Sequence, residues 1–81
     1  MAYPDVVRLA VESLATELKQ PREQISVVRF EPHEWPDSSL GCPQPGRTYL
    51  QVITPGYRVI LAAGGQQYEL HTNQTTMVTR C

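Results

Sequence analysis

The sequence predicts an α+β fold in which one N-terminal amphipathic helix packs on an antiparallel sheet of four or five strands, in two layers. Two observations predict it. Apolar residues recur at helical spacing near the N-terminus, and from residue 25 onward β-branched residues form short runs separated by turn signals. With 81 residues, the chain is long enough for one such unit, and we expect residues 1–81 to form a single domain.

Residues 5–19 have the pattern of one amphipathic helix. Val7 is followed at helical spacing by four further apolar residues, which are Ala10, Val11, Leu14 and Leu18. Asp5 is the expected N-cap, because its side chain can accept hydrogen bonds from the first free amides. Pro21 ends the helix, since it disfavours α geometry at the residue before it.

Residues 25–31 are rich in β-branched side chains and predict a strand. The adjacent Val27 and Val28 break the alternation, which indicates either a bulge or a strand covered on both faces. Pro32 indicates an edge strand beyond that point.

The C-terminal half predicts a meander of strands over residues 48–53, 57–62 and 67–72, with a short last strand at Met77-Val78. Pro55-Gly56 suits a type II turn, and Gly64-Gly65 suits a primed hairpin turn. The predicted core contains the apolar residues of the helix and strands, namely Val11, Leu14, Leu18, Ile25, Val27, Val52, Val59, Leu61 and Leu70.

Residues 35–46 predict a stiff loop, because three prolines fix φ and two glycines permit positive φ. Trp35 and Leu40 are the expected anchors that pack this loop onto the sheet. The loop either closes one end of the sheet or forms a preorganised contact surface, and the two roles are compatible. The candidate binding residues are Trp35, Asp37, Ser38, Ser39, Leu40, Gln44, Tyr49 and Tyr57.

The two cysteines, Cys42 and Cys81, allow one intramolecular disulfide, which would close a loop of about 40 residues and stabilise the fold by roughly 4 kcal/mol. The alternative is two free thiols. The protein is expected in the cytoplasm if Met1 is the native start, and exported if the chain is an excised domain with the bridge.

The alternative function is thiol catalysis by Cys42. A small thiol hydrolase would pair Cys42 with His71, oriented by Asp37 or Asn73, but the thiolate lacks an obvious cationic or helix-end neighbour. Cys42, Cys81, His33 and His71 lack the short spacings of a zinc site. We therefore expect no catalytic residue, no metal and no cofactor.

The net charge and the length of the apolar runs exclude two classes of partner. Seven basic and eight acidic residues give a net charge of −1, which provides no electrostatic basis for binding nucleic acid. No apolar run reaches the roughly 18 residues of a membrane span. We expect another protein as the partner, and a monomer or a weak dimer, because the edge near residues 25–31 could pair with a second copy.

Two segments resemble a signature of small bacterial domains of unknown function. The first contains Trp35-Pro36-Asp37, Leu40-Gly41-Cys42-Pro43, Pro45-Gly46 and Tyr49, and the second contains Pro55-Gly56-Tyr57, Gly65, Tyr68 and His71-Thr72. The resemblance covers about residues 6–72. It implies one intact domain and no known activity, so no catalytic residue transfers.

These observations favour a non-catalytic binding module that presents the loop of residues 35–46. The helix-plus-sheet arrangement is similar, at the level of fold alone, to cystatin-type protease inhibitors, although their Gln-x-Val-x-Gly signature is absent. A structural accessory domain of an exported protein is the third hypothesis.

Overall fold

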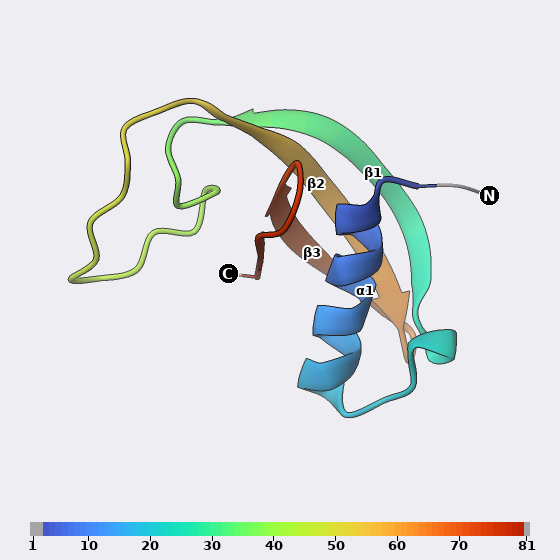
Figure 1. The fold of residues 1–81 in the computed structure, drawn as a ribbon. Coiled ribbons are helices and arrows are strands. Elements are labelled where there is room, and N and C mark those ends of the chain that lie inside the picture. The colour runs from blue at the N-terminus through green and yellow to red at the C-terminus, as the bar shows by residue number, and fades with distance from the viewer. Residues whose placement is uncertain (1–2, 81) are drawn as a thin grey trace.

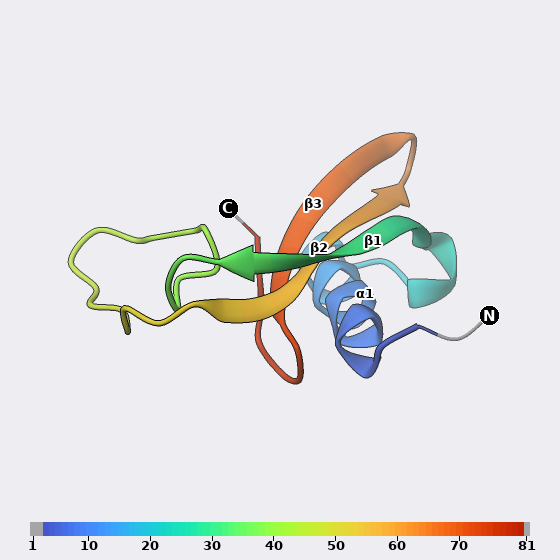
Figure 2. The same ribbon diagram turned by 90° about the horizontal axis from the view of Figure 1, so that it is seen from above.

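The computed structural model describes residues 3–80, and its strands form one antiparallel meander. The elements are α1 (Asp5–Leu18), the short 3₁₀ helix η1 (Arg22–Gln24), β1 (Ser26–Trp35), β2 (Thr54–Ala63), β3 (Gln66–Asn73) and β4 (Val78–Thr79). The sheet order is β1-β2-β3-β4, and α1 lies across one face of the twisted sheet (Figures 1 and 2). The predicted α+β class is confirmed.

α1 buries the predicted apolar stripe, with Val7, Ala10 and Leu14 fully enclosed. The capping prediction was wrong, because Pro4 is the N-cap and makes no side-chain cap. Asp5 is instead the first helical residue, where its charge complements the helix dipole, and it pairs with Arg8. At the other end Lys19 adopts a left-handed conformation with φ 56°, so the helix stops one residue earlier than predicted.

The main core lies between α1 and the sheet. Its buried residues from the helix and strands are Val7, Ala10, Leu14, Ile25, Val59, Leu61, Ala63 and Leu70. Three predicted core residues, Val11, Leu18 and Val27, are partly buried against this cluster. Val59 and Leu61 on β2 alternate with Arg58 and Ile60, whose side chains therefore belong to the opposite face of the sheet.

β1 is longer than predicted and continues to Trp35. Of the two alternatives predicted for Val27 and Val28, the structure has the bulge, seen as a register shift between Val27 and Arg29. Pro32 lies inside the strand, opposite Tyr57, and is tolerated because β1 is an edge strand of the sheet formed by residues 3–80.

The predicted strand at residues 48–53 and the predicted turn at Pro55-Gly56 were both wrong. β2 runs straight through Pro55, which lies outside the β2–β3 ladder because that ladder begins at the pair Gly56 and Asn73. Glycine at position 56 lets β2 and β3 approach closely, because a Cβ there would lie 1.8 Å from the carbonyl oxygen of Thr72. Residues 36–53 are therefore one long connection, and Val52, a predicted core residue, is 55% exposed.

The two strands predicted over residues 57–62 and 67–72 and the turn between them are confirmed, and the short last strand exists but lies at Val78–Thr79, one residue later than predicted. Gly64 and Gly65 both have positive φ, as a primed turn between β2 and β3 requires. β4 pairs with β3 at His71 and Thr72, and Cys81 lies outside the described residues. Within residues 3–80, the structure has no helix that combines the length and apolar character of a membrane span.

Candidate functional site

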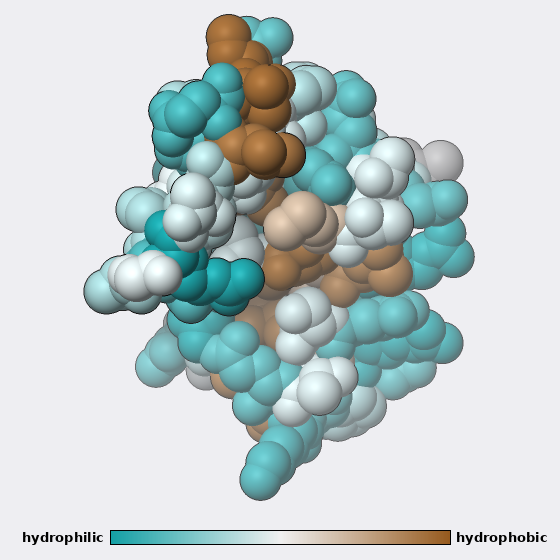
Figure 3. All heavy atoms as spheres, turned by 60° about the vertical axis from the view of Figure 1, so that its left-hand side comes forward, coloured by the Kyte–Doolittle hydropathy of each residue, from teal (hydrophilic) through white to brown (hydrophobic). Residues whose placement is uncertain are grey.

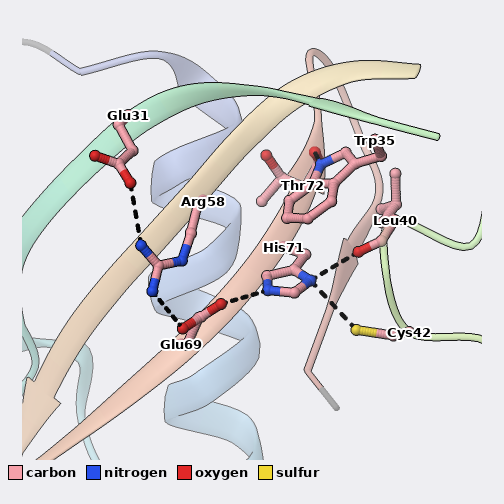
Figure 4. Close-up of polar contacts among 8 residues, drawn as sticks. All are labelled: Glu31, Trp35, Leu40, Cys42, Arg58, Glu69, His71 and Thr72. Atoms are coloured by element: carbon pink, nitrogen blue, oxygen red, sulfur yellow. Dashed lines mark hydrogen bonds and ion pairs between the residues drawn. The ribbon is translucent and has the colours of Figure 1, made fainter. Parts of the chain in front are cut away.

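A polar network covers the face of the sheet opposite α1. The strand register places Arg58 of β2 between Glu31 of β1 and His71 of β3. The Arg58 guanidinium donates to Glu31 Oε1 at 3.1 Å and to Glu69 Oε1 at 3.0 Å. The second oxygen of Glu69 lies 2.7 Å from His71 Nε2, so one chain of contacts crosses three strands (Figure 4).

The network favours the ionised form of the Glu69 carboxylate. The hydrogen bond from Arg58, followed by the contact with His71, lowers the pKa of Glu69 from 4.5 to about 2. The same pairing with Glu69, and then with Glu31, raises the pKa of Arg58. Because the Glu69 side chain is 40% exposed, solvent screens this pairing, and the network orients side chains more than it stabilises the fold.

Trp35 is the centre of a second, apolar contact next to this network. Its indole Nε1 donates to the carbonyl oxygen of Thr72 at 2.9 Å, so the ring reaches across to β3. The ring stacks on the His71 imidazole with centroids 4.2 Å apart and touches His33 at 4.1 Å. Only 5% of Trp35 is exposed, which confirms the prediction that it points inward.

We call residues 35–42 the anchor segment, because they attach the long connection to the sheet. Leu40 is 1% exposed, and its carbonyl oxygen lies 2.7 Å from His71 Nδ1. Leu40 and Gly41 both adopt left-handed conformations, with φ 58° and 78°. Glycine is favoured at position 41, because φ is positive there and a Cβ would lie 3.1 Å from the indole ring of Trp35, which is tighter than an ordinary contact.

Side-chain hydrogen bonds fix the turn inside the anchor segment. Asp37 Oδ1 accepts from the amide of Ser39 at 2.9 Å and from its hydroxyl, and this pair of bonds, the hydroxyl first, lowers the pKa of Asp37. Ser38 donates its amide to the Leu50 carbonyl at 3.1 Å and accepts the Leu50 amide on its hydroxyl at 2.9 Å. These two bonds tie the second half of the connection to the first.

We call residues 43–53 the distal segment. Three of its large apolar side chains face solvent: Leu50 is 70% exposed, Val52 is 55% exposed and Ile53 is 68% exposed. Figure 3 shows an apolar patch at the top of the loop-bearing side, where the chain leads into β2. The Tyr49 hydroxyl accepts the Gln44 amide at 3.0 Å, which gives the segment a hydrogen bond of its own.

The predicted binding residues divide into three groups. Trp35, Asp37, Ser38, Ser39 and Leu40 all lie in the anchor segment, where their contacts are made within the chain. Gln44 and Tyr49 lie in the distal segment.

Tyr57 lies elsewhere, on the helix-covered face, where its ring meets that of Phe30 at 6.1 Å. The sequence reasoning missed Leu50 and Ile53 as surface residues, because their high β-propensity placed them in a strand. It also missed the contacts of Arg58 with Glu31 and Glu69. The signal available for these was their alternation with core residues along β1 to β3.

The structure brings together the pair on which a thiol enzyme would depend. Cys42 Sγ lies 3.4 Å from His71 Nδ1. Cys42 is disulfide-bonded, however, and Cys81, the predicted partner, lies outside the described residues. A disulfide sulfur is not a thiolate nucleophile. Across residues 3–80, no three His, Cys, Asp or Glu side chains are grouped so as to hold a metal ion.

The fold and site define a small α+β domain with a long connection attached to the uncovered face of its sheet. The family model described as a domain of unknown function (DUF8738) matches residues 7–81. The chain therefore belongs to this family. Neither the curated proteins nor the solved structures contain a match.

Proposed function

We propose that the protein is a non-catalytic binding module whose contact surface is the distal segment and whose partner is another protein. The observation that supports this most strongly is the exposure of Leu50, Val52 and Ile53 within four residues of one another. Such a group of exposed large apolar side chains is typical of an interaction site.

The anchor segment supports the proposal because it restricts the contact surface before binding. Ser38 holds Leu50 through two hydrogen bonds, and Ser38 itself belongs to a turn attached to the sheet by Trp35 and Leu40. A surface that is ordered in the free protein loses less conformational entropy on binding.

The charge of the distal segment favours a protein partner. Arg47 is the one charged residue in the distal segment, and the other residues of 43–53 are apolar or uncharged polar. A surface of this composition matches an apolar groove on a protein better than a polyanion, which would need several cations.

A test compares the Val52→Ser, Ile53→Ser double variant with the control Leu9→Ser. Leu9 is an exposed leucine on α1, 37% exposed, and lies far along the chain from the loop. Wild type and the control should capture the same protein from extracts of cells that express the chain. With that protein purified, calorimetry should show binding at least about tenfold weaker for the double variant. Equal affinity of all three proteins contradicts the proposal.

Inhibition of a protease is a more specific form of this binding, raised only by analogy with the helix-plus-sheet arrangement of cystatin-type inhibitors, and no solved structure matches the chain. An inhibitor would lower the activity of a purified protease in proportion to its concentration, and the double variant would lose that effect. Binding without inhibition leaves the broader proposal standing and removes the inhibitory form.

A further inference from the structure

The two ring nitrogens of His71 face two different parts of the molecule, and both face hydrogen-bond acceptors. Nδ1 lies 2.7 Å from the carbonyl oxygen of Leu40, in the anchor segment. Nε2 lies 2.7 Å from the carboxylate oxygen of Glu69, on the same strand as His71. A carbonyl and a carboxylate accept hydrogen bonds and donate none, so only a ring with a hydrogen on each nitrogen can satisfy both contacts.

The charged groups nearest the ring belong to the network on the open face of the sheet. Glu31 and Glu69 flank Arg58, so this network carries one net negative charge beside His71. In the anchor segment, Asp37 accepts a hydrogen bond from the amide of Ser39. The Cys42 sulfur is in a disulfide and does not titrate.

His33 lies against Trp35, the ring on which His71 stacks. From β4, the residue opposite His71 is the uncharged Thr79. A cationic His71 therefore meets a complementary charge at Glu69.

We propose that His71 is a proton-dependent latch: its doubly protonated ring joins the anchor segment to β3, and loss of the Nδ1 proton releases the Leu40 carbonyl. This inference rests on the proposed function, since it describes how presentation of the distal segment is regulated. The bond to Glu69 is charge-assisted and stronger than the bond to a neutral carbonyl, so a singly protonated ring keeps its hydrogen on Nε2. The bare Nδ1 lone pair then faces the Leu40 oxygen and repels it.

The direction of the pH effect follows. Histidine exchanges its proton between about pH 5 and 8. The latch is closed on the acid side of this window and open on the alkaline side. The hydrogen bond from Trp35 to Thr72 does not involve the His71 ring, so we expect opening to loosen the anchor segment without unfolding the sheet.

The test is a pH titration from 5 to 9 of the ¹⁵N-labelled protein by NMR. In wild type, both ring nitrogens of His71 should carry hydrogen at the acid end, and Nδ1 should lose it at the alkaline end. Over the same range, the exchange protection of the Cys42 amide, which donates to Ser39 in the anchor turn, should fall about tenfold after correction for intrinsic exchange.

His33→Gln is the matched control, because His33 touches the same indole but makes no side-chain hydrogen bond among residues 3–80. The titration of the anchor amides should persist in His33→Gln and disappear in His71→Gln. The ring measurement on wild type stands even if His71→Gln fails to fold. An Nδ1 that keeps its hydrogen at pH 9, or anchor amides that do not titrate, overturns the latch. Neither result bears on partner binding, which is tested separately at one pH.

Discussion

From the end of β1 to the start of β2, the large apolar side chains of the anchor segment face the sheet, whereas those of the distal segment face solvent. Trp35 and Leu40 are 5% and 1% exposed, while Leu50 and Ile53 are 70% and 68% exposed. The two segments are adjacent in sequence and have similar shares of apolar residues. The difference shows that burial against the sheet and exposure to solvent fall on separate residues, so we expect substitutions in one segment to leave the other intact.

The largest expected effect is on the anchor segment, through Trp35→Ala. This change removes a buried ring, its stacking on His71 and its hydrogen bond to Thr72. We expect the free energy of unfolding to fall by about 3–5 kcal/mol, measured by urea denaturation. A fall below about 1 kcal/mol would show that the anchor segment contributes little to the fold.

Gly41→Ala should have the next largest effect, with Gly46→Ala as its control. Both glycines have positive φ, 78° and 79°, so both variants strain the backbone. Only at position 41 does the new Cβ meet the Trp35 ring; at position 46 it meets nothing within 4 Å. We expect Gly41→Ala to lower the unfolding free energy by about 1–3 kcal/mol more than Gly46→Ala. Equal losses would contradict the close packing of Gly41 on the indole.

Protonation of Glu69 at low pH should lower the free energy of unfolding by a smaller amount. Its pKa is about 2 in the folded protein and 4.5 without the network, so its contribution is present above about pH 4.5 and is lost as the pH falls toward 2. Because the side chain is 40% exposed, we expect this contribution to be about 1 kcal/mol at most. Glu69→Gln should reduce the slope of stability against pH in this range, and Glu34→Gln, an exposed β1 control, should leave it unchanged.

The smallest effect on stability should come from the distal segment. Val52→Ser and Ile53→Ser each change a side chain that is already more than half exposed, so the unfolding free energy should change by no more than about 0.5 kcal/mol. Thermal denaturation measures this. A loss near 2 kcal/mol for either variant would show that these side chains pack against the domain, and would remove the basis for a contact surface.

Sequence reasoning succeeded for the elements in which the spacing of apolar residues along the chain shows which face is buried. The stripe that begins at Val7 specified α1, and the alternation around Leu70 specified β3, because one face of each element is buried. The inward direction of Trp35 and Leu40 could also be predicted, since large apolar residues in a stiff loop need a surface on which to pack.

The errors came from features that depend on residues distant in sequence. The β-propensity of residues 48–53 is high, but it does not indicate whether a partner strand is available. Pro55-Gly56 suggested a turn because the sequence does not show how the strands pair. In the structure, the pairing of β2 with β3 stops at Gly56, so Pro55 has no β3 partner, and the Thr72 carbonyl approaches Gly56 closely. The contact of His71 with Leu40 spans 31 positions and has no local signal.

The most direct test of the division between the two segments is residue-specific amide hydrogen exchange of the wild-type protein. The amide of Cys42 donates to Ser39, whereas those of Gln51, Val52 and Ile53 have no hydrogen-bond acceptor within residues 3–80. We predict that the anchor amide exchanges at least about tenfold more slowly than the three distal amides, relative to their intrinsic rates. Equal protection in the two segments would contradict the account.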